Sequence, residues 1–206
     1  MEIDQLDDYI AAAQNGDRVA LGKIIDIYAE PIHSFIYHTI GRSIEVEDLA
    51  QDTFVKMITN IQQYRPTAPF RAWLFRIALN VCRDHLRKKK VRRIMSSLLP
   101  DKWEEEMDIK SPGPTPDKEA DTKDYLEQLN IIVSKLPENL RTVFLMRDVQ
   151  DMSYEEISAA LNWQMGTVKS RLNRARTLIA QKINLLEENP DAKKIAKIME
   201  RNKPKQ

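Results

Sequence analysis

Apolar residues recur at helical spacing in blocks that polar turns separate. The first block covers residues 4–14, and the second covers residues 19–40, where Pro31 is expected to kink or split the helix. A third helix is expected over residues 43–64, and a fourth from Phe70 to about Arg92. The pattern therefore predicts a helical first half.

Residues 96–122 lack this periodicity. A Ser-Pro-Gly-Pro-Thr-Pro run and a Glu-Glu-Glu run lie within them, which is typical of a flexible or locally extended linker. Helical spacing returns at 124–136 and again after Pro137. We therefore expect an all-α protein of two small helical domains joined by a flexible acidic linker, with domains at 1–95 and 123–187 and a C-terminal tail at 188–206.

A helix-turn-helix is predicted in the second half. Ser153 and Glu156 have the spacing of a capping box, so a helix begins there. Residues 162–166 break the pattern, and a second helix is expected to start near Thr167. Its buried stripe is predicted to be Val168, Leu172, Ala175 and Ile179. Two short helices with such a turn are typical of DNA-binding proteins.

The exposed side of this second helix is basic. Ser170, Asn173 and Arg174 lie opposite the buried stripe, where side chains can reach base edges in a major groove. The flanking cations are positioned to contact phosphates; they are Lys169, Arg171 and Arg176. The alternative is a solvated basic helix in an ordinary bundle.

The fourth helix carries a second candidate surface. Its outward row lies beside Trp73 and has a spacing of i, i+4, i+7 and i+11; it consists of Arg76, Asn80, Arg83 and Arg87. An arginine and amide row beside an aromatic ring suits a nucleic-acid backbone with stacked or extruded bases. The alternative is an exposed basic helix with a core tryptophan.

The third helix has an acidic outward face. Asp48, Asp52 and Val55 point away from its predicted core face, with Gln51 and Lys56 on the flanks. An exposed valine among acids indicates a protein contact. An ordinary solvated face is the alternative.

Charge is segregated along the chain although the net charge is only +1. Residues 83–93 hold seven Lys or Arg against one acid, whereas residues 101–124 hold nine acids against four lysines. This distribution indicates one surface for a polyanion and a separate acidic segment. The low glycine count, five in 206 residues, favours helices over sheets.

Enzyme chemistry is not indicated. Cys82 is the single cysteine, which excludes an internal disulfide and fits packing inside a helix. His33 and His38 lack further ligands at suitable spacing, so no metal or cofactor is expected. The acidic N-terminus is unlike a signal peptide, and no apolar run approaches the roughly 18 residues of a membrane span. We expect a cytoplasmic protein without membrane insertion or a small-molecule substrate.

Five segments in this order resemble the extracytoplasmic-function (ECF) sigma factors, bacterial subunits that direct transcription initiation. They are residues 47–54 (Glu-Asp-Leu-Ala-Gln-Asp-Thr-Phe), 70–80, 136–138, 153–157 and 166–176. The resemblance covers nearly the whole chain. The chain differs at Trp163-Gln164-Met165, where many members have a small residue and a proline, and in the tail, which the family does not explain.

The resemblance implies the following roles. RNA polymerase core would bind Asp48, Gln51, Asp52 and Val55. The −10 element of promoter DNA would be read and opened by Lys56, Tyr64, Arg65, Phe70, Arg71, Trp73, Arg76, Asn80, Arg83 and Arg87. The −35 element would be bound by Thr167, Lys169, Ser170, Arg171, Asn173, Arg174 and Arg176. An anti-sigma factor is an expected partner. A stand-alone helix-turn-helix regulator explains the second half equally well, but not the basic and aromatic element of the first; a helical adaptor without a DNA role is a further alternative.

Overall fold

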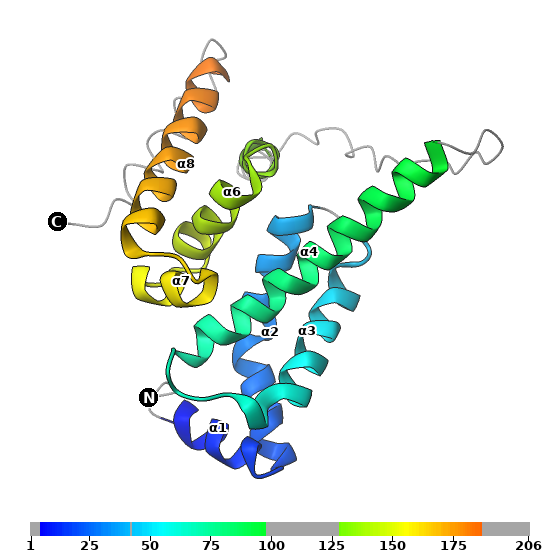
Figure 1. Cartoon of the computed structure of the whole chain (residues 1–206), viewed down its shortest axis with the longest axis vertical. Helices are drawn as coiled ribbons and strands as arrows, with labels where there is room; N and C mark the ends of the chain where they lie inside the picture. The colour runs from blue at the N-terminus through cyan, green and yellow to red at the C-terminus, as the bar shows by residue number, and fades with distance from the viewer. Residues whose placement is uncertain (1–4, 42, 98–127, 187–206) are drawn as a thin grey trace, which may run out of the picture.

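The computed structural model describes residues 5–41, 43–97 and 128–186, and the regular structure within these ranges is helical (Figure 1). The first bundle consists of α1 (Leu6–Gln14), α2 (Arg18–Ile40), α3 (Val46–Asn60), the 3-10 turn η1 (Ile61–Gln63) and α4 (Phe70–Ser97). The second bundle consists of a helical segment at 128–134, α6 (Glu138–Phe144), the π-helical turn η2 (Leu145–Val149), α7 (Tyr154–Leu161) and α8 (Met165–Leu186). The predicted all-α class is confirmed.

Helices α2, α3 and α4 pack together to form the core of the first bundle. The predicted inner face of α3 is buried, and it consists of Val46, Ala50, Thr53 and Met57. Phe35 of α2 meets Phe75 of α4 edge to face, with ring centroids 5.2 Å apart. Gln14 of α1 donates to the carbonyls of Ile61 and Tyr64, both at 2.9 Å, and so ties α1 to the turn that precedes α4.

Helix α2 has the predicted start and end, and it runs through Pro31 without a break. Asp17 caps its start, since its Oδ1 accepts from the backbone N–H groups of Val19 at 2.7 Å and Ala20 at 3.2 Å. Gly41 ends it with a φ of 84°, which favours glycine. Pro31 does not split the helix, which is continuous from Arg18 to Ile40. Buried side chains on both sides of Pro31 hold the helix against the core; they include Tyr28, Ile32 and Phe35.

The second bundle has the helix-turn-helix that the sequence predicts. Ser153 and Glu156 form the capping box, with reciprocal bonds of 3.0 and 2.7 Å. The predicted stripe of α8 is fully buried, at 0 % exposure for Val168, Leu172, Ala175 and Ile179. Helix α8 begins at Met165, two positions before the expected Thr167.

The two bundles are in contact. Helix α7 packs against α4, and η2 packs against α2 (Figure 1). Most of the predicted linker, residues 98–122, and the tail at 188–206 lie outside the described residues, while 96–97 belong to the end of α4. The sequence predicts two separate bundles, but their contact depends on residues far apart in the chain.

Candidate nucleic-acid interface

A hollow of about 650 Å³ lies between α3 and α4. Five predicted residues of the −10 set line it, although they come from two helices: Lys56, Trp73, Asn80, Arg83 and Arg87. The prediction missed four others that share the hollow, which are Asn60, Gln63, Ile77 and Asp84. Asn60 follows Lys56 by one helical turn, so the same spacing argument could have found it. A cavity of this size is comparable to one that holds a small organic group, such as a nucleobase.

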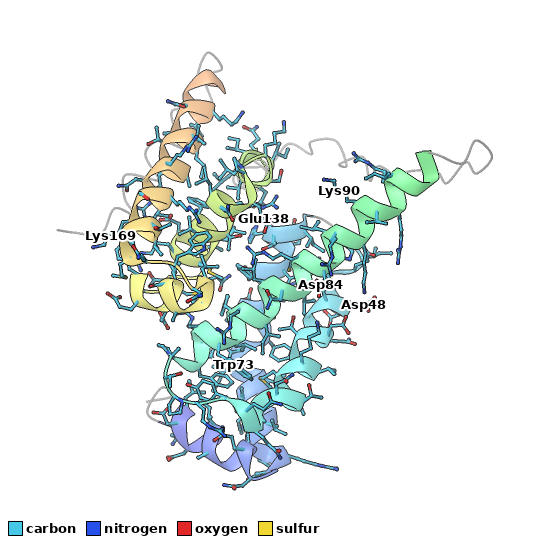
Figure 2. All side chains as sticks on the ribbon, viewed as in Figure 1. Asp48, Trp73, Asp84, Lys90, Glu138 and Lys169 are labelled. Carbon is cyan, nitrogen blue, oxygen red and sulfur yellow. The ribbon has the colours of Figure 1, made fainter. Side chains whose placement is uncertain are left out.

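Charge in the hollow is positive but partly compensated. Arg87 donates to Asp84 at 3.1 Å, an exposed pair one turn apart on α4. Arg83 donates to Glu138 of the second bundle at 2.7 Å. Lys56 is exposed at the opposite wall. Trp73, Asp84 and Lys90 mark successive positions along α4, from the aromatic end of the hollow to the basic end of the helix (Figure 2).

Three aromatic rings cluster at the end of the hollow that Trp73 lines. Tyr64, Phe70 and Trp73 lie with ring centroids 5.2 to 5.3 Å apart. Tyr64 is only 8 % exposed and Phe70 only 4 % exposed, whereas Trp73 is half-buried and lines the hollow. Direct DNA contacts were predicted for all three rings. In this structure Tyr64 and Phe70 support Trp73 from behind, because burial in the core leaves them little accessible surface.

Three further arginines of the predicted −10 set lie outside the hollow. Arg65 donates to the carbonyls of Gln62 and Tyr64 at 2.8 and 3.1 Å, which holds the loop before α4. Arg71 lies over the Phe75 ring and donates to the Gln150 carbonyl of the second bundle. Arg76 is exposed on α4. Only tertiary packing separates these arginines from those that line the hollow.

The acidic face of α3 is exposed as predicted. Asp48, Gln51 and Asp52 are exposed, and Val55 is 57 % exposed. Ile58, which the prediction omitted, is also exposed, at 40 %. Two apolar side chains one turn apart beside carboxylates form a surface suited to a protein partner.

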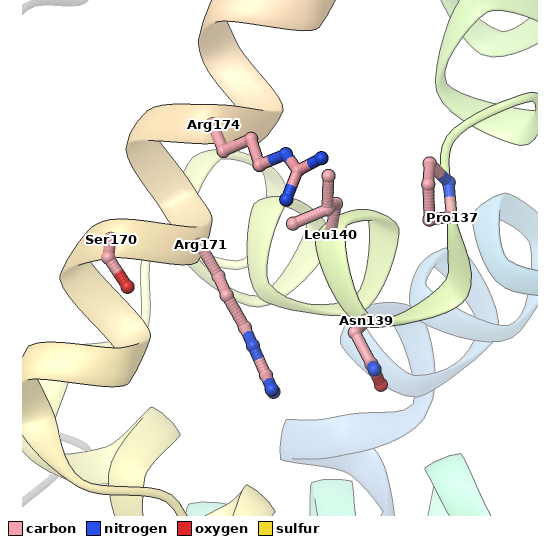
Figure 3. A pocket seen from close by; sticks show the side chains of 6 residues that line it. All are labelled: Pro137, Asn139, Leu140, Ser170, Arg171 and Arg174. Atoms are coloured by element: carbon pink, nitrogen blue, oxygen red, sulfur yellow. The ribbon is translucent and has the colours of Figure 1, made fainter.

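A second hollow, of about 540 Å³, lies between α6 and α8. Ser170, Arg171 and Arg174 line it from α8, and Arg174 extends toward Leu140 of α6 (Figure 3). Asn173 is exposed on the same helix, and Thr167 lies in its first turn. The three side chains predicted to meet base edges therefore lie on one accessible side of α8.

Aromatic rings hold two cations of the predicted −35 set. The Arg171 guanidinium stacks 3.9 Å from the Trp163 ring centroid. The Lys169 ammonium lies 5.5 Å from the Tyr154 ring centroid. Such contacts fix where a long flexible cation points.

Arg176 has a different position from the other predicted phosphate contacts. It donates to both carboxylate oxygens of Asp148, at 2.6 and 3.2 Å, and so links α8 to η2. The hydrogen bond to Asp148 raises the pKa of Arg176 above its ordinary value. In this structure Arg176 therefore joins α8 to η2 within the second bundle. The sequence could not show this, because the two partners are 28 positions apart.

The Cys82 thiol, the reactive group of the single cysteine, is buried in the core. Burial raises the pKa of the Cys82 thiol to about 12. Within the described residues, no three His, Cys, Asp or Glu side chains are grouped to hold a metal ion. No helix in those residues has the length and apolarity to cross a membrane.

Comparison with known proteins extends these observations. Residues 24–103 match the family Sigma-70 region 2, and residues 126–179 match Sigma-70, region 4. Together with two helical bundles and a helix-turn-helix, these matches define a sigma factor. The chain is 30 % identical to the ECF RNA polymerase sigma factor SigW of Bacillus subtilis, over 84 % of this chain and 94 % of SigW. It is 32 % identical to the ECF RNA polymerase sigma-E factor of Escherichia coli, over 89 % of this chain and 97 % of that protein. The chain belongs to the ECF RNA polymerase sigma factor family.

A solved structure has the same fold across both bundles. CnrH, in complex with the cytosolic domain of CnrY, superposes with a TM-score of 0.64 and 25 % sequence identity. The match covers 88 % of this chain and 96 % of CnrH.

Proposed function

We propose that the chain is an alternative sigma factor, which binds RNA polymerase core and directs promoter recognition and opening. The observation that carries this proposal is the pair of basic hollows on one chain. One is built on a helix-turn-helix and suits paired DNA, and the other places an indole among an amide and cations and suits an unpaired base. A stand-alone helix-turn-helix regulator requires only the first.

The second bundle would hold the −35 duplex. Lys169 and Arg171 would contact phosphates and set the register of α8 in the major groove. Ser170, Asn173 and Arg174 would read base edges, and each good pairing contributes about 1–3 kcal/mol of discrimination. Thr167 lies in the first turn of α8, where the helix N-terminus would favour a nearby phosphate.

The first bundle would capture a base of the −10 element after strand separation. Extruding a base costs a few kcal/mol. Stacking on the Trp73 indole returns about 1–3 kcal/mol. The Asn80 amide would hydrogen-bond the base edge, while Lys56 and Arg87 would attract the backbone. The free energy of extruding a base and the free energy returned by stacking are similar. The free chain is therefore expected to open promoters poorly, and polymerase binding must supply the additional free energy.

The exposed face of α3 would seat this bundle on the polymerase. Asp48 and Asp52 would pair with basic groups of the polymerase. Val55 and Ile58, exposed on the same helix, would make an apolar contact with it. An anti-sigma partner would restrain the chain by covering such surfaces. Proteins of this fold have been solved with partners of that kind, for example the sigma factor RpoE with the anti-sigma factor NepR from Bartonella quintana.

Run-off transcription tests the proposal. The full chain and purified core polymerase are incubated with promoters taken from the source genome, and transcripts are expected only when both proteins are present. The variant Val55→Asp should abolish both core pulldown and transcription, while Thr59→Ser, an exposed change on the same helix, should preserve both. If core polymerase neither binds the native chain nor transcribes with it, the assignment is refuted and the stand-alone regulator is favoured.

A further inference from the structure

Asn60 is an amide whose orientation the protein itself fixes. It is the last residue of α3, and it lines the hollow between α3 and α4. Its Nδ2 donates to the Lys56 carbonyl at 2.7 Å and to the Thr59 hydroxyl at 3.2 Å. Because a carbonyl oxygen can only accept, the amide nitrogen of Asn60, and not its oxygen, must face Lys56.

Both hydrogens of the Asn60 amide are occupied by these two contacts. The Thr59 hydroxyl donates its own hydrogen to the Val55 carbonyl at 3.0 Å, so its oxygen is left to accept from Asn60. Among the described residues, no donor bonds to the Oδ1 of Asn60. This carbonyl oxygen is therefore the hydrogen-bonding group that Asn60 offers to a molecule in the hollow.

The other two amides of the hollow have no such constraint. Gln63 and Asn80 line it and are exposed, and neither side chain makes a hydrogen bond within the described part of the chain. A free amide can rotate to present either its oxygen or its nitrogen, so it can pair with a base edge of either kind. Asn60 presents an acceptor only, and it can therefore discriminate where Gln63 and Asn80 cannot.

The cations of the hollow are better suited to phosphates than to the choice of a base. Carboxylates already accept from Arg83 and Arg87, at 2.7 and 3.1 Å. Lys56 is exposed, and its ammonium is a strongly hydrated point charge on a flexible stem. Such a group attracts a phosphate from many directions but does not fix one atom of a base. The neutral group with a set direction is Asn60.

We infer that Asn60 makes this hollow selective for a base with an exocyclic amine, which is cytosine or adenine. The inference rests on the proposed function and deepens it by naming the class of base. Cytosine N4 and adenine N6 are donors, whereas thymine O4 and guanine O6 are acceptors at the corresponding position. An amine would donate to Oδ1 while the base stacks on Trp73. A keto oxygen in its place would set two acceptors against each other and leave both unpaired.

Matched pairs of bases test this selectivity. The full chain is assembled with core polymerase and titrated with a fluorescein-labelled single strand that carries the −10 element of a promoter it transcribes. Each position in turn carries cytosine or uracil, and then adenine or hypoxanthine. Within each pair an amine is exchanged for a keto oxygen at nearly constant size. At one position the amine base is expected to bind at least about fivefold more tightly than its keto counterpart.

Two variants attribute the preference to Asn60. Asn60→Ala should reduce it to less than about twofold, chiefly by weakening the binding of the amine base. Gln63→Ala is the matched control, since it removes an amide from the same hollow and should weaken both bases of a pair equally. If Asn60→Ala does not fold, Asn60→Ser replaces it. A serine hydroxyl can still donate to the Lys56 carbonyl but presents no fixed acceptor, so the preference should again be lost.

Two results would overturn the inference. One is equal binding of amine and keto bases at every position by the native chain, a comparison that needs no variant. The other is a preference that persists without the Asn60 amide while all bases bind more weakly, which would show that Asn60 only stabilises the end of α3. A holoenzyme that binds the −10 strand with no base at any position would instead refute the proposed function, so the two failures are distinguishable.

Discussion

Replacing Trp163 by alanine should weaken promoter binding although Trp163 need not contact a base. Its backbone is fixed to the end of α7, because the Trp163 N–H donates to the Ser158 carbonyl at 3.1 Å and the Ser158 hydroxyl donates to the Trp163 carbonyl. The indole lies beside α8, against the Arg171 side chain. Arg171 stacks on it at 3.9 Å, which leaves the N–H groups at the guanidinium edge able to reach phosphate oxygens.

The expected magnitude follows from this geometry. A cation–π contact at an exposed site is worth about 0.5–1 kcal/mol. If the contact orients Arg171 before binding, Trp163→Ala should weaken duplex affinity by about two- to fivefold. Trp163→Phe keeps an aromatic face and should recover part of the loss. Arg171→Ala removes the charge as well and should reduce the slope of log affinity against log salt by about 0.9, whereas Trp163→Ala should leave that slope nearly unchanged.

The assay is a double-mutant cycle on duplex binding by the full chain with core polymerase. A labelled duplex carrying the −35 element is titrated at several salt concentrations, with thermal unfolding of each variant as a control for folding. Trp163→Ala should cost little once Arg171 is alanine, because the contact is already absent. If the two losses simply add, Trp163 does not act through Arg171 and the reasoning is wrong.

Three other predictions concern separate parts of the molecule. Trp73→Ala should leave duplex binding by the holoenzyme nearly intact but reduce promoter opening about tenfold or more, measured by permanganate reactivity of unpaired thymines, since stacking returns about 1–3 kcal/mol. Asp148→Asn should lower the free energy of unfolding by about 1 kcal/mol in urea titrations, because it removes a charge-assisted bond to Arg176 that is partly exposed. Burial lowers the pKa of His38, against smaller upward effects of Asn130 and Glu30. The unfolded chain therefore binds more protons at this site, and stability should fall as the pH drops below about 6.5. His38→Gln should reduce that fall, measured by urea unfolding near pH 7.5 and near pH 5.5; an equal fall in both proteins would exclude His38 as the source.

Most of the helical structure could be predicted because its determinants are local. The spacing of apolar residues identified the buried faces of α3 and α8, and the pairing of Ser153 with Glu156 fixed the start of α7. Asp17 and Gly41 set the ends of α2 in the same way. Pro31 shows the limit of local rules, since the sequence allowed either a kink or a split there, and packing on both sides of it keeps α2 continuous.

The candidate sites were only partly predictable. A periodic row on α4 identified Asn80, Arg83 and Arg87, but it could not show that Arg76 lies outside the hollow that they line. Tyr64 and Phe70 were predicted to contact DNA because they are aromatic. In the structure both rings are buried and pack against Trp73. These differences arise because side-chain exposure depends on which helices pack together.

What the sequence determined by itself is therefore the set of helices, the sign of charge on their faces and the order of the two bundles. Only the tertiary structure decided how individual cations are used. Asp148 binds Arg176, Trp163 stacks on Arg171, and Glu138 binds Arg83 across the bundles. Helical periodicity repeats every few residues, whereas these pairs join positions that chain folding brings together, and no local pattern encodes such a distance.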